Sequence, residues 1–393
     1  MTHSFVHLSS FVPVVKILNI VGARPNFIKV APLHRAFLTY PAIQSKIVHT
    51  GQHADSRMSD VFFKQLALPQ PDYSLGPGPA SPCTQTQQTA RILVEFEAVL
   101  MAEQPDWVVV VGDVTSTLAC GLAAAQGGIR VAHVEAGLRS GDRRMPEEMN
   151  RILTDTLSDL LFVTESAGLD NLRREGIPDE KVWFVGNVMI DSLVRYRPQA
   201  NELDTVGRLS LIPGEYILVT THRPANVDHE AGLVNMVQIV EAASAHKMVV
   251  FPVHPRTQAN LVRFGLMSRL MAIPTVRVLE PQGYLEFLNL MEHAAVVITD
   301  SGGVQEETTF LQVPCLTVRA STERPVTVDL GTNQLLADLN PATVRYHIGE
   351  ILAGRIKAAA IPPLWDGRAA GRIADILLNE RTPVCSRQGF RPA

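Results

Sequence analysis

The sequence is poor in cysteine and in charge. Its four cysteines form no C-x-x-C pair and have no nearby histidine partners, so neither a zinc site nor a disulfide framework is indicated. Lysine and arginine number 35 against 39 acidic residues, a net charge of −4, so no global positive field attracts a nucleic acid or an anionic membrane. We therefore expect no nucleic-acid partner, and any anionic ligand must be bound locally.

Long hydrophobic runs are also absent from the sequence. No apolar stretch reaches the roughly 18 residues of a transmembrane helix, and residues 1–13 lack the basic start and the small-residue cleavage site of a signal peptide. Together with the unpaired cysteines, this predicts a protein of the reducing cytoplasm with no membrane partner. A hydrophobic fraction of 46%, with 26 glycines and 26 prolines spread along the chain, excludes disordered, collagen-like and coiled-coil classes.

The chain does contain two series of short runs rich in valine, isoleucine and leucine, separated by amphipathic stretches. The first series covers residues 15–21, 108–111, 129–134, 160–163 and 182–185, and the second covers 216–221, 248–253, 275–279, 295–299 and 315–318. Such alternation is typical of buried parallel strands in βαβ units. The predicted fold class is therefore α/β, with two Rossmann-like doubly wound domains that face each other across a central cleft.

The domain boundaries follow from length and composition. A chain of 393 residues is too long for one ordinary core. Residues 196–214 carry two prolines and no strand pattern, which suits a connection between domains. We predict an N-terminal domain at 14–190, a C-terminal domain at 191–366, and a final helix at 367–380 that packs back on the N-terminal domain. Residues 381–393 are predicted to be a loose tail.

Polar residues follow the first strand, at the end of the sheet where ligands bind. The turn after residue 21 leads into a helix pattern with Pro25 at its start. Arg24 and Lys29 add cationic charge to a helix N-terminus that already favours anions, which predicts a phosphate-binding turn. The alternative is that both are solvated surface cations.

Three acids lie at strand ends or helix starts of the first half. Asp113 and Glu135 each follow a predicted strand, and Glu147 lies in the first turn of a predicted helix. Such acids at the mouth of an α/β cleft are typical of proton transfer. The alternatives are that Asp113 caps the next helix, that Asp113 and Glu135 each pair with Arg139 or Arg143, and that Glu147 complements a helix dipole.

Two histidines follow strands of the second half. His222 and His254 each stand at a strand end, which suits a role in a binding site. The alternative for each is a structural hydrogen-bonding role. Cys120 and Cys315 fall within a predicted helix and a predicted strand, so we expect both in the core.

The segment around Ser301 is the sharpest signal in the second half. A strand ends there, Ser301 caps the following helix, and Gly302 and Gly303 let backbone amides approach an oxyanion. Glu307 lies four residues after Gly303, and helical side chains lean toward the N-terminus, so its carboxylate can reach vicinal hydroxyls beside a bound phosphate. A ribose diphosphate satisfies this set.

Two familiar nucleotide motifs are missing. Neither G-x-G-x-x-G nor G-x-x-x-x-G-K-[ST] occurs, which disfavours dinucleotide oxidoreductases and P-loop NTPases. Cations and an amide nest for phosphates, opposite three acids, describe a nucleotide-sugar site. Breaking the bond from C1 to the diphosphate develops oxocarbenium character, which carboxylates stabilise. Spacing alone leaves glycosyl transfer, elimination and epimerisation open.

Nine segments resemble the non-hydrolysing UDP-N-acetylglucosamine 2-epimerases, in order from about residue 15 to 380. They are GARPNFIKVAPL, TGQH at 50–53, GDVTSTLA at 112–119, HVEAGLRSGD at 133–142, PEEMNR at 146–151, THRPAN at 221–226, PVHP at 252–255, TDSGGVQEE at 299–307 and TERP at 322–325. The resemblance implies a fold of the glycosyltransferase-B type and a homodimer. It also implies interconversion of UDP-N-acetylglucosamine and UDP-N-acetylmannosamine through 2-acetamidoglucal, with no redox cofactor and no metal.

The resemblance also assigns roles to single residues. Asp113, Glu135 and Glu147 remove and return the C2 proton and stabilise charge at C1. Lys29 and His222 lie near the reacting sugar and the diphosphate. The residues that the resemblance places on UDP are Arg24, Ser301, Gly302, Gly303 and Glu307, with His254 and Arg151 as weaker matches and Gln52 and His53 at a second site.

The chain departs from the better-known bacterial pattern in several places. Residues 141–148 read GDRRMPEE, a form that also resembles epimerases acting on UDP-diacetamido uronic acids. Residues 75–80 lack the arginine that some members use with an activating second substrate, and Val326 follows TERP where an acid is common.

Four alternatives to the UDP-N-acetylglucosamine 2-epimerase therefore stand: a 2-epimerase of a UDP-diacetamido uronic acid, a UDP-sugar glycosyltransferase of the same fold, a hydrolysing epimerase, and a catalytically silent nucleotide-sugar sensor. The three acids argue against the transferase. Their retention together with Lys29 and His222 argues against the sensor. The hydrolysing enzyme is distinguished by whether a UDP-linked product accumulates. The epimer would feed the synthesis of a cell-surface polysaccharide.

Overall fold

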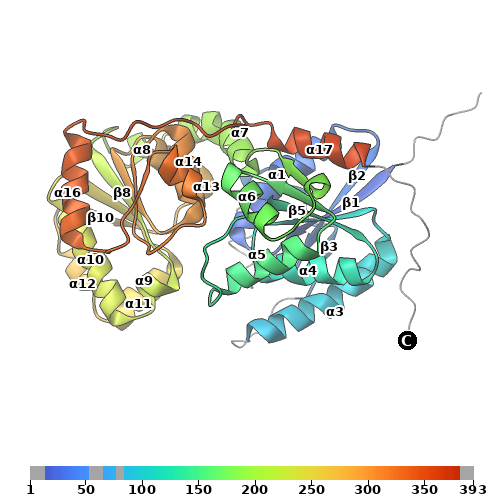
Figure 1. The fold of residues 1–393 in the computed structure, drawn as a ribbon. Helices are drawn as coiled ribbons and strands as arrows, with labels where there is room; N and C mark the ends of the chain where they lie inside the picture. Colours follow the sequence, from blue (N-terminus) through green and yellow to red (C-terminus); the bar gives the residue numbers. More distant parts are fainter. Residues whose placement is uncertain (1–13, 53–64, 77–83, 381–393) are drawn as a thin grey trace, which may run out of the picture.

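The computed structural model describes residues 14–52, 65–76 and 84–380, without the side chain of Arg24. Within these residues the strands form two sheets, with the orders β3-β2-β1-β4-β5-β6-β7 and β10-β9-β8-β11-β12-β13 (Figure 1). Every strand pair is parallel. Both orders are doubly wound, so the predicted fold class is confirmed.

The first sheet contains β1 (Val15–Val21), β2 (Ile43–His49), β3 (Tyr73–Ser74), β4 (Trp107–Val111), β5 (Arg130–Ala136), β6 (Leu160–Val163) and β7 (Val182–Phe184). The second contains β8 (Tyr216–Thr220), β9 (Met248–Pro252), β10 (Val276–Leu279), β11 (Val296–Thr299), β12 (Cys315–Thr317) and β13 (Asn333–Leu335). All ten predicted runs are strands. β2, β3 and β13 were not predicted, because β2 carries polar residues at its centre and the other two are very short.

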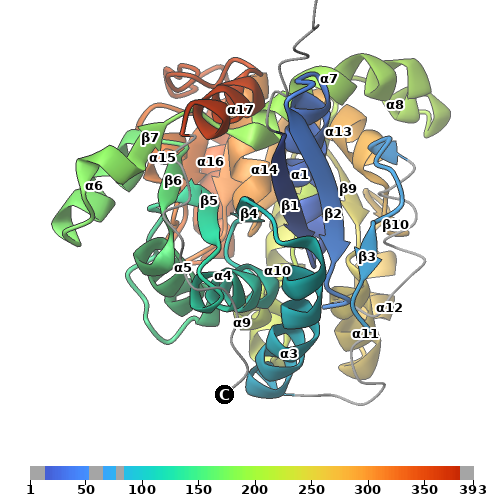
Figure 2. The same cartoon turned by 90° about the vertical axis from the view of Figure 1, so that its right-hand side faces the viewer.

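Helices cover both faces of the first sheet. One face carries α1 (Arg24–Leu38) and α17 (Ala369–Asn379), and the other carries α3 (Gln85–Glu103), α4 (Thr115–Gln126) and α5 (Pro146–Leu157) (Figure 1). Figure 2 shows this sheet in front of the second domain. Along β4, Trp107, Val109 and Val111 belong to one apolar cluster and Val108 and Val110 to another. Burial on both faces explains why the strand reads as a continuous apolar run.

The second sheet is covered in the same way. Its outer face carries α10 (Glu230–Ser244) and α16 (Pro341–Leu352), and α13 (Tyr284–Glu292) and α14 (Gly302–Leu311) lie toward the first domain (Figure 1). The shorter elements are α6 (Ser166–Arg174), the 3-10 helix η1 (Asp179–Lys181), α8 (Thr205–Arg208), α9 (Pro224–Val227), α11 (Pro255–Arg263), α12 (Met267–Met271) and α15 (Pro325–Asp329). In the part of the chain that the structure describes, no helix has both the length and the apolar composition needed to cross a bilayer.

The segment between the two sheets is helical. The predicted connection at 196–214 contains the end of α7 (Val188–Leu203), the short helix α8 and a turn. The side chain of Asn187 caps the N-terminus of α7 by accepting from the amide of Met189 at 2.9 Å. Apolar residues of α7, among them Leu193 and Tyr196, belong to the same cluster as residues of both sheets. One apolar core therefore runs from the first domain into the second.

The last described helix, α17, lies along α1 of the first domain (Figure 1). The carboxylate of Asp191 accepts from the backbone amides of Ala369 at 3.1 Å and Ala370 at 2.7 Å, at the start of α17. The Tyr40 hydroxyl donates to Asp375 at 2.7 Å. These contacts bring the C-terminal segment back across both domains.

Candidate active site

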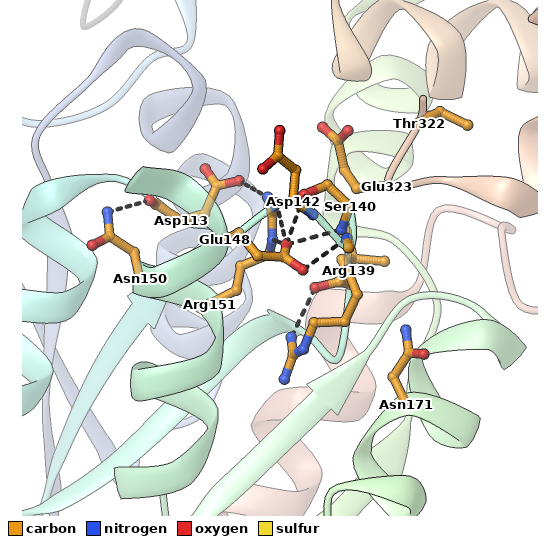
Figure 3. A network of polar contacts seen from close by, with 12 residues as sticks. Asp113, Arg139, Ser140, Asp142, Glu148, Asn150, Arg151, Asn171, Thr322 and Glu323 are labelled. Atoms are coloured by element: carbon orange, nitrogen blue, oxygen red, sulfur yellow. Dashed lines mark hydrogen bonds and ion pairs between the residues drawn. The ribbon is translucent and has the colours of Figure 1, made fainter. Parts of the chain in front are cut away.

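Asp113 lies in the turn between β4 and α4. Gly112 has φ 68°, a left-handed conformation that suits glycine, and the N-cap of α4 is Val114, so Asp113 does not cap this helix. Its carboxylate forms an ion pair with the buried guanidinium of Arg151, and its carbonyl accepts from the Asn150 side chain at 2.8 Å (Figure 3). Both partners come from α5, so the Asp113 turn is held against that helix.

Glu135 occupies a β-bulge near the end of β5. Val134 and Ala136 pair with successive residues of β6, and Glu135 between them has φ 74°, a conformation that is costly for a residue with a side chain. The bulge turns the Glu135 side chain into a buried position, where it is 3% exposed. Its carboxylate forms ion pairs there with Lys29 of α1 and, at 2.8 Å, with Arg324. Backbone strain of this kind is often found at functional sites.

The charge state of Glu135 follows from these partners. Burial by itself raises the pKa of the carboxyl, but the positive charges of Lys29 and Arg324 outweigh burial and hold the pKa below its usual value. Glu135 is therefore a carboxylate, which is the state that accepts a proton.

Two adjacent glutamates in the first turn of α5 have different surroundings. Glu148 is buried and accepts from the backbone amides of Ser140 and Gly141, each at 2.9 Å, and from Arg151 at 2.8 Å (Figure 3). Glu147 is half-buried and forms no ion pair with another described residue. Glu148 therefore anchors the preceding loop, whereas Glu147 is available to a ligand.

Asp300 organises the loop after β8 in the second domain. Its buried carboxylate accepts from the amides of His222 and Arg223, each at 3.0 Å, and from the side chain of Asn226 at 2.9 Å. The Nδ1 atom of His222 lies 3.3 Å from the same carboxylate. The rings of His222 and His254 lie 5.4 Å apart between centroids, so the two strand-end histidines are neighbours.

The N-terminus of α14 has the predicted glycines but not the predicted cap. Ser301 is the N-cap residue, yet its side chain makes no capping hydrogen bond. A Cβ atom on Gly302 would lie 2.4 Å from Nη1 of Arg324, and one on Gly303 would lie 2.9 Å from Cε of Met189. Close packing therefore favours glycine at position 302, whereas the flexible end of the Met189 side chain can move away from a Cβ atom at position 303. The N-terminus of a helix attracts anions.

Glu307 is buried between α13 and α14. Its carboxyl accepts from the Tyr284 hydroxyl at 3.0 Å. Burial raises the pKa of Glu307 to about 8, and the hydrogen bond from Tyr284 opposes this rise. A ligand hydroxyl at this position would have to share the carboxyl group with Tyr284.

Arg324 was not predicted as a site residue, yet it joins the two domains. It donates to Glu135 at 2.8 Å and to Glu323, and its Nε lies 2.8 Å from a Glu306 oxygen without the alignment of a hydrogen bond. Burial opposes its charge, but these carboxylates hold the pKa of Arg324 well above its usual value. Arg324 belongs to the motif TERP and Glu306 to the motif TDSGGVQEE, so both could be noticed in the sequence. Their position beside Glu135 depends on the tertiary structure and could not be predicted from the motifs.

Three predicted site residues remain: Gln52, His53 and Arg24. Gln52 is described, and its side-chain oxygen accepts from the amide of Ser116 at 3.0 Å, at the start of α4. His53 and the side chain of Arg24 lie outside the described residues.

Cys120 and Cys315 are free and buried, as predicted. Within the described ranges, no three histidine, cysteine or acidic side chains are grouped as a metal site requires.

Comparisons with known proteins give a consistent result. The family model for UDP-N-acetylglucosamine 2-epimerase matches residues 35–378. The UDP-N-acetylglucosamine 2-epimerase of Methanocaldococcus jannaschii is 42% identical over 368 residues, which cover 92% of this chain and 99% of that protein. The UDP-2,3-diacetamido-2,3-dideoxy-D-glucuronate 2-epimerase of Pseudomonas aeruginosa is 40% identical over 371 residues, which cover 92% and 99%.

A solved structure supports the same relationship. The crystal structure of the M. jannaschii UDP-GlcNAc 2-epimerase in complex with UDP-GlcNAc and UDP has a TM-score of 0.85 and 41% identity, and the match covers 93% of this chain and 100% of that chain. Sequence and fold therefore agree over nearly the whole length of the protein. The chain belongs to the UDP-N-acetylglucosamine 2-epimerase family.

Proposed function

We propose that this protein interconverts UDP-N-acetylglucosamine and UDP-N-acetylmannosamine. The observation that carries the proposal is the ionised Glu135, held in a strained bulge between Lys29 and Arg324. A carboxylate placed between two cations, with the amides of the α14 N-terminus beside Arg324, is suited to move a proton while a diphosphate leaves.

The reaction consists of an elimination and an addition. A carboxylate acting as general base accepts the C2 proton, the C–H electrons form the C1=C2 bond of 2-acetamidoglucal, and the C1–O bond breaks so that UDP leaves with its electron pair. A proton is then returned to the other face of C2, and UDP adds again at C1. Asp113, Glu135 and Glu147 are the acids in this scheme. The electrons stay within the sugar and UDP, so the sum of the steps is neither an oxidation nor a reduction.

The phosphates lie toward the second domain in this proposal. Lys29 and His222 neutralise the charge that develops on the leaving diphosphate. The residues assigned to UDP are Arg24, His254, Ser301, Gly302, Gly303 and Glu307. Arg151 is instead assigned to Asp113, because its buried guanidinium forms ion pairs with Asp113 and Glu148.

A second candidate substrate is a UDP-2,3-diacetamido uronic acid. A relative with that activity is 40% identical to this chain, and residues 141–148 resemble the corresponding loop of such enzymes. Arg143 and Arg144 are exposed on this loop, and Arg144 contacts Asp142 at 2.8 Å. A uronic acid carries a C6 carboxylate that these cations would attract.

Proton NMR in D2O tests both substrates. The purified protein is incubated with UDP-N-acetylglucosamine and, separately, with the UDP-diacetamido uronic acid. Deuterium at C2, together with UDP-N-acetylmannosamine signals, is expected from the first incubation. Exchange with the uronic acid alone would favour the second candidate, and free N-acetylmannosamine without its UDP form would indicate a hydrolysing enzyme.

We further propose the molecular setting of this activity. The domains divide at 14–190 and 191–366, and 367–380 packs back on the first, which the contacts of α17 with α1 support. The protein acts as a cytoplasmic homodimer that supplies precursors for cell-surface polysaccharides. Light scattering after gel filtration tests the dimer, with twice the 43.0 kDa chain mass as the expected result.

A further inference from the structure

A buried histidine and a buried aspartate lie directly behind the two strand-end acids. His133 on β5 and Asp155 on α5 are both fully buried, and Nδ1 of His133 lies 2.6 Å from Oδ1 of Asp155. The other ring nitrogen, Nε2, lies 2.8 Å from the carbonyl oxygen of Gly112. The imidazole therefore bridges α5 and the turn that carries Asp113.

These contacts determine where the protons are. A carbonyl oxygen only accepts, so Nε2 of His133 donates to Gly112. Oδ2 of Asp155 accepts from the amide of Gly137 at 3.1 Å and lies 2.7 Å from Nη2 of Arg139. These two donors on Oδ2 favour the carboxylate form of Asp155, so Nδ1 of His133 donates to Oδ1. An imidazole that donates from both nitrogens is a cation.

The charged groups around the ring agree with this state. Burial raises the pKa of Asp155, but His133 and Arg139 outweigh it and hold the pKa below its usual value. On the same strand, the positive charge of His133 adds to those of Lys29 and Arg324 in lowering the pKa of Glu135. Among the groups that face the imidazole, Asp155 and Glu135 carry negative charge, Arg139 carries positive charge, and Gly112 presents a carbonyl.

The same pair also touches the backbone beside each acid. Gly112 immediately precedes Asp113, and Gly137 lies two residues after Glu135. We propose that His133 and Asp155 are positioning residues, an imidazolium–carboxylate pair that fixes the Asp113 turn and the Glu135 bulge relative to each other. The proposal rests on the proposed function, because that function assigns proton transfer to these two acids.

The geometry explains why both ring nitrogens of His133 must carry a hydrogen. A neutral imidazole has one N–H, so it would lose the contact with either Gly112 or Asp155. Removal and return of a proton on opposite faces of C2 require both acids at fixed places, and a misplacement of about 1 Å can cost about a hundredfold in rate. Most residues assigned to UDP lie in the second domain, and the remaining one, Arg24, belongs to α1. We therefore expect UDP binding not to depend on this pair.

The test compares His133→Gln and Asp155→Asn with His34→Gln. His34 is a matched control because it is also a buried histidine of the first domain, and it contacts the hydroxyl of Ser45 at 2.8 Å. Ser45 is on β2, which is separated from β5 by β1 and β4 in the sheet. We expect kcat to fall about ten- to a hundredfold in the first two variants. We expect KM and the calorimetric affinity for UDP to stay within about twofold, and His34→Gln to lose stability without a change in kcat.

A spectrum of the wild-type protein keeps the proposal testable if the variants fail to fold. Nitrogen-15 NMR of labelled histidine should show an N–H on both ring nitrogens of His133 in the folded protein. A neutral ring, or an unchanged kcat in folded His133→Gln, would overturn the inference. Inactivity of the wild type on both UDP-sugars would overturn the proposed function instead, and the ring spectrum would still decide the charge of His133.

Discussion

At the scale of single residues, the three predicted acids have distinct surroundings. Glu135 is buried between two cations, Asp113 is a quarter exposed and paired with Arg151, and Glu147 is half-buried without an ion pair among the described residues. Different environments allow carboxyl groups of one site to take different roles in proton transfer.

We expect Asp113→Asn and Glu135→Gln to abolish turnover, because each removes an acid assigned to proton transfer. A loss of about a hundred- to ten-thousandfold in kcat is typical of such groups. UDP affinity, measured by calorimetry, should be retained in both variants because neither acid is assigned to UDP. Asp170→Asn, which changes an exposed aspartate of α6, is the control and should keep full activity. Full activity in either test variant would remove that acid from the mechanism.

Glu165 provides a test of buried charge at the same scale. It is 1% exposed, and neither carboxyl oxygen has a hydrogen-bond partner among the described residues. Burial, helped by the charge of Glu306, raises its pKa from 4.5 to about 8. Between these pH values the folded protein holds a proton that the unfolded chain releases, so this residue lowers stability as pH rises from about 4.5 to 8.

Glu165→Gln removes this titration. The variant should gain stability relative to the wild type as pH rises from 5 to 8, with a difference of about 1 to 3 kcal/mol between the two conditions. Urea denaturation at both pH values measures this difference. Glu180→Gln, at an exposed position before β7, should show the same stability difference from wild type at both. A pH-independent effect of Glu165→Gln would contradict the raised pKa.

At the scale of elements, the start of α14 depends on glycine for space. Gly302→Ala places a Cβ atom 2.4 Å from Arg324, which cannot move without leaving Glu135. We expect a loss of stability of about 1 to 3 kcal/mol and at least a tenfold loss of kcat/KM, measured by urea denaturation and steady-state kinetics. Gly371→Ala in α17 has no atom within 4 Å and should be neutral or stabilising by about 0.5 to 1 kcal/mol. Similar stability and kcat/KM in the two variants would show that Arg324 can move away from a side chain at position 302.

At the scale of the whole molecule, Arg324 ties the domains together beside the continuous apolar core. Arg324→Gln leaves Glu135, Glu306 and Glu323 buried with less positive charge. We expect a loss of about 3 to 5 kcal/mol in the free energy of unfolding, together with loss of turnover. The control Arg269→Gln breaks an exposed pair with Glu241 and should leave the free energy of unfolding nearly unchanged. If urea denaturation shows equal losses of unfolding free energy in the two variants, the buried network stabilises the protein no more than the exposed pair does.

The elements of the fold were largely predictable from the sequence. Runs such as 108–111 are apolar on both faces because helices cover both sides of the sheet, and that pattern is local. β2 was missed because Gln44, Ser45 and Lys46 interrupt its apolar run, and the segment 196–203 was not predicted as a helix. In α7 the burial of residues such as Tyr196 against both domains stabilises the helix, and its sequence shows no such partner.

The sequence by itself determined the strand ends, and therefore which side of each sheet carries Asp113, Glu135, His222 and Ser301, because strand and turn patterns depend on near neighbours. Only the tertiary structure decided which of these groups meet. Glu135 and Arg324 are 189 positions apart, and His133 and Asp155 are 22 apart on different elements. Such contacts depend on how the two sheets and their helices pack, and no local pattern in the chain encodes the distance between two charges.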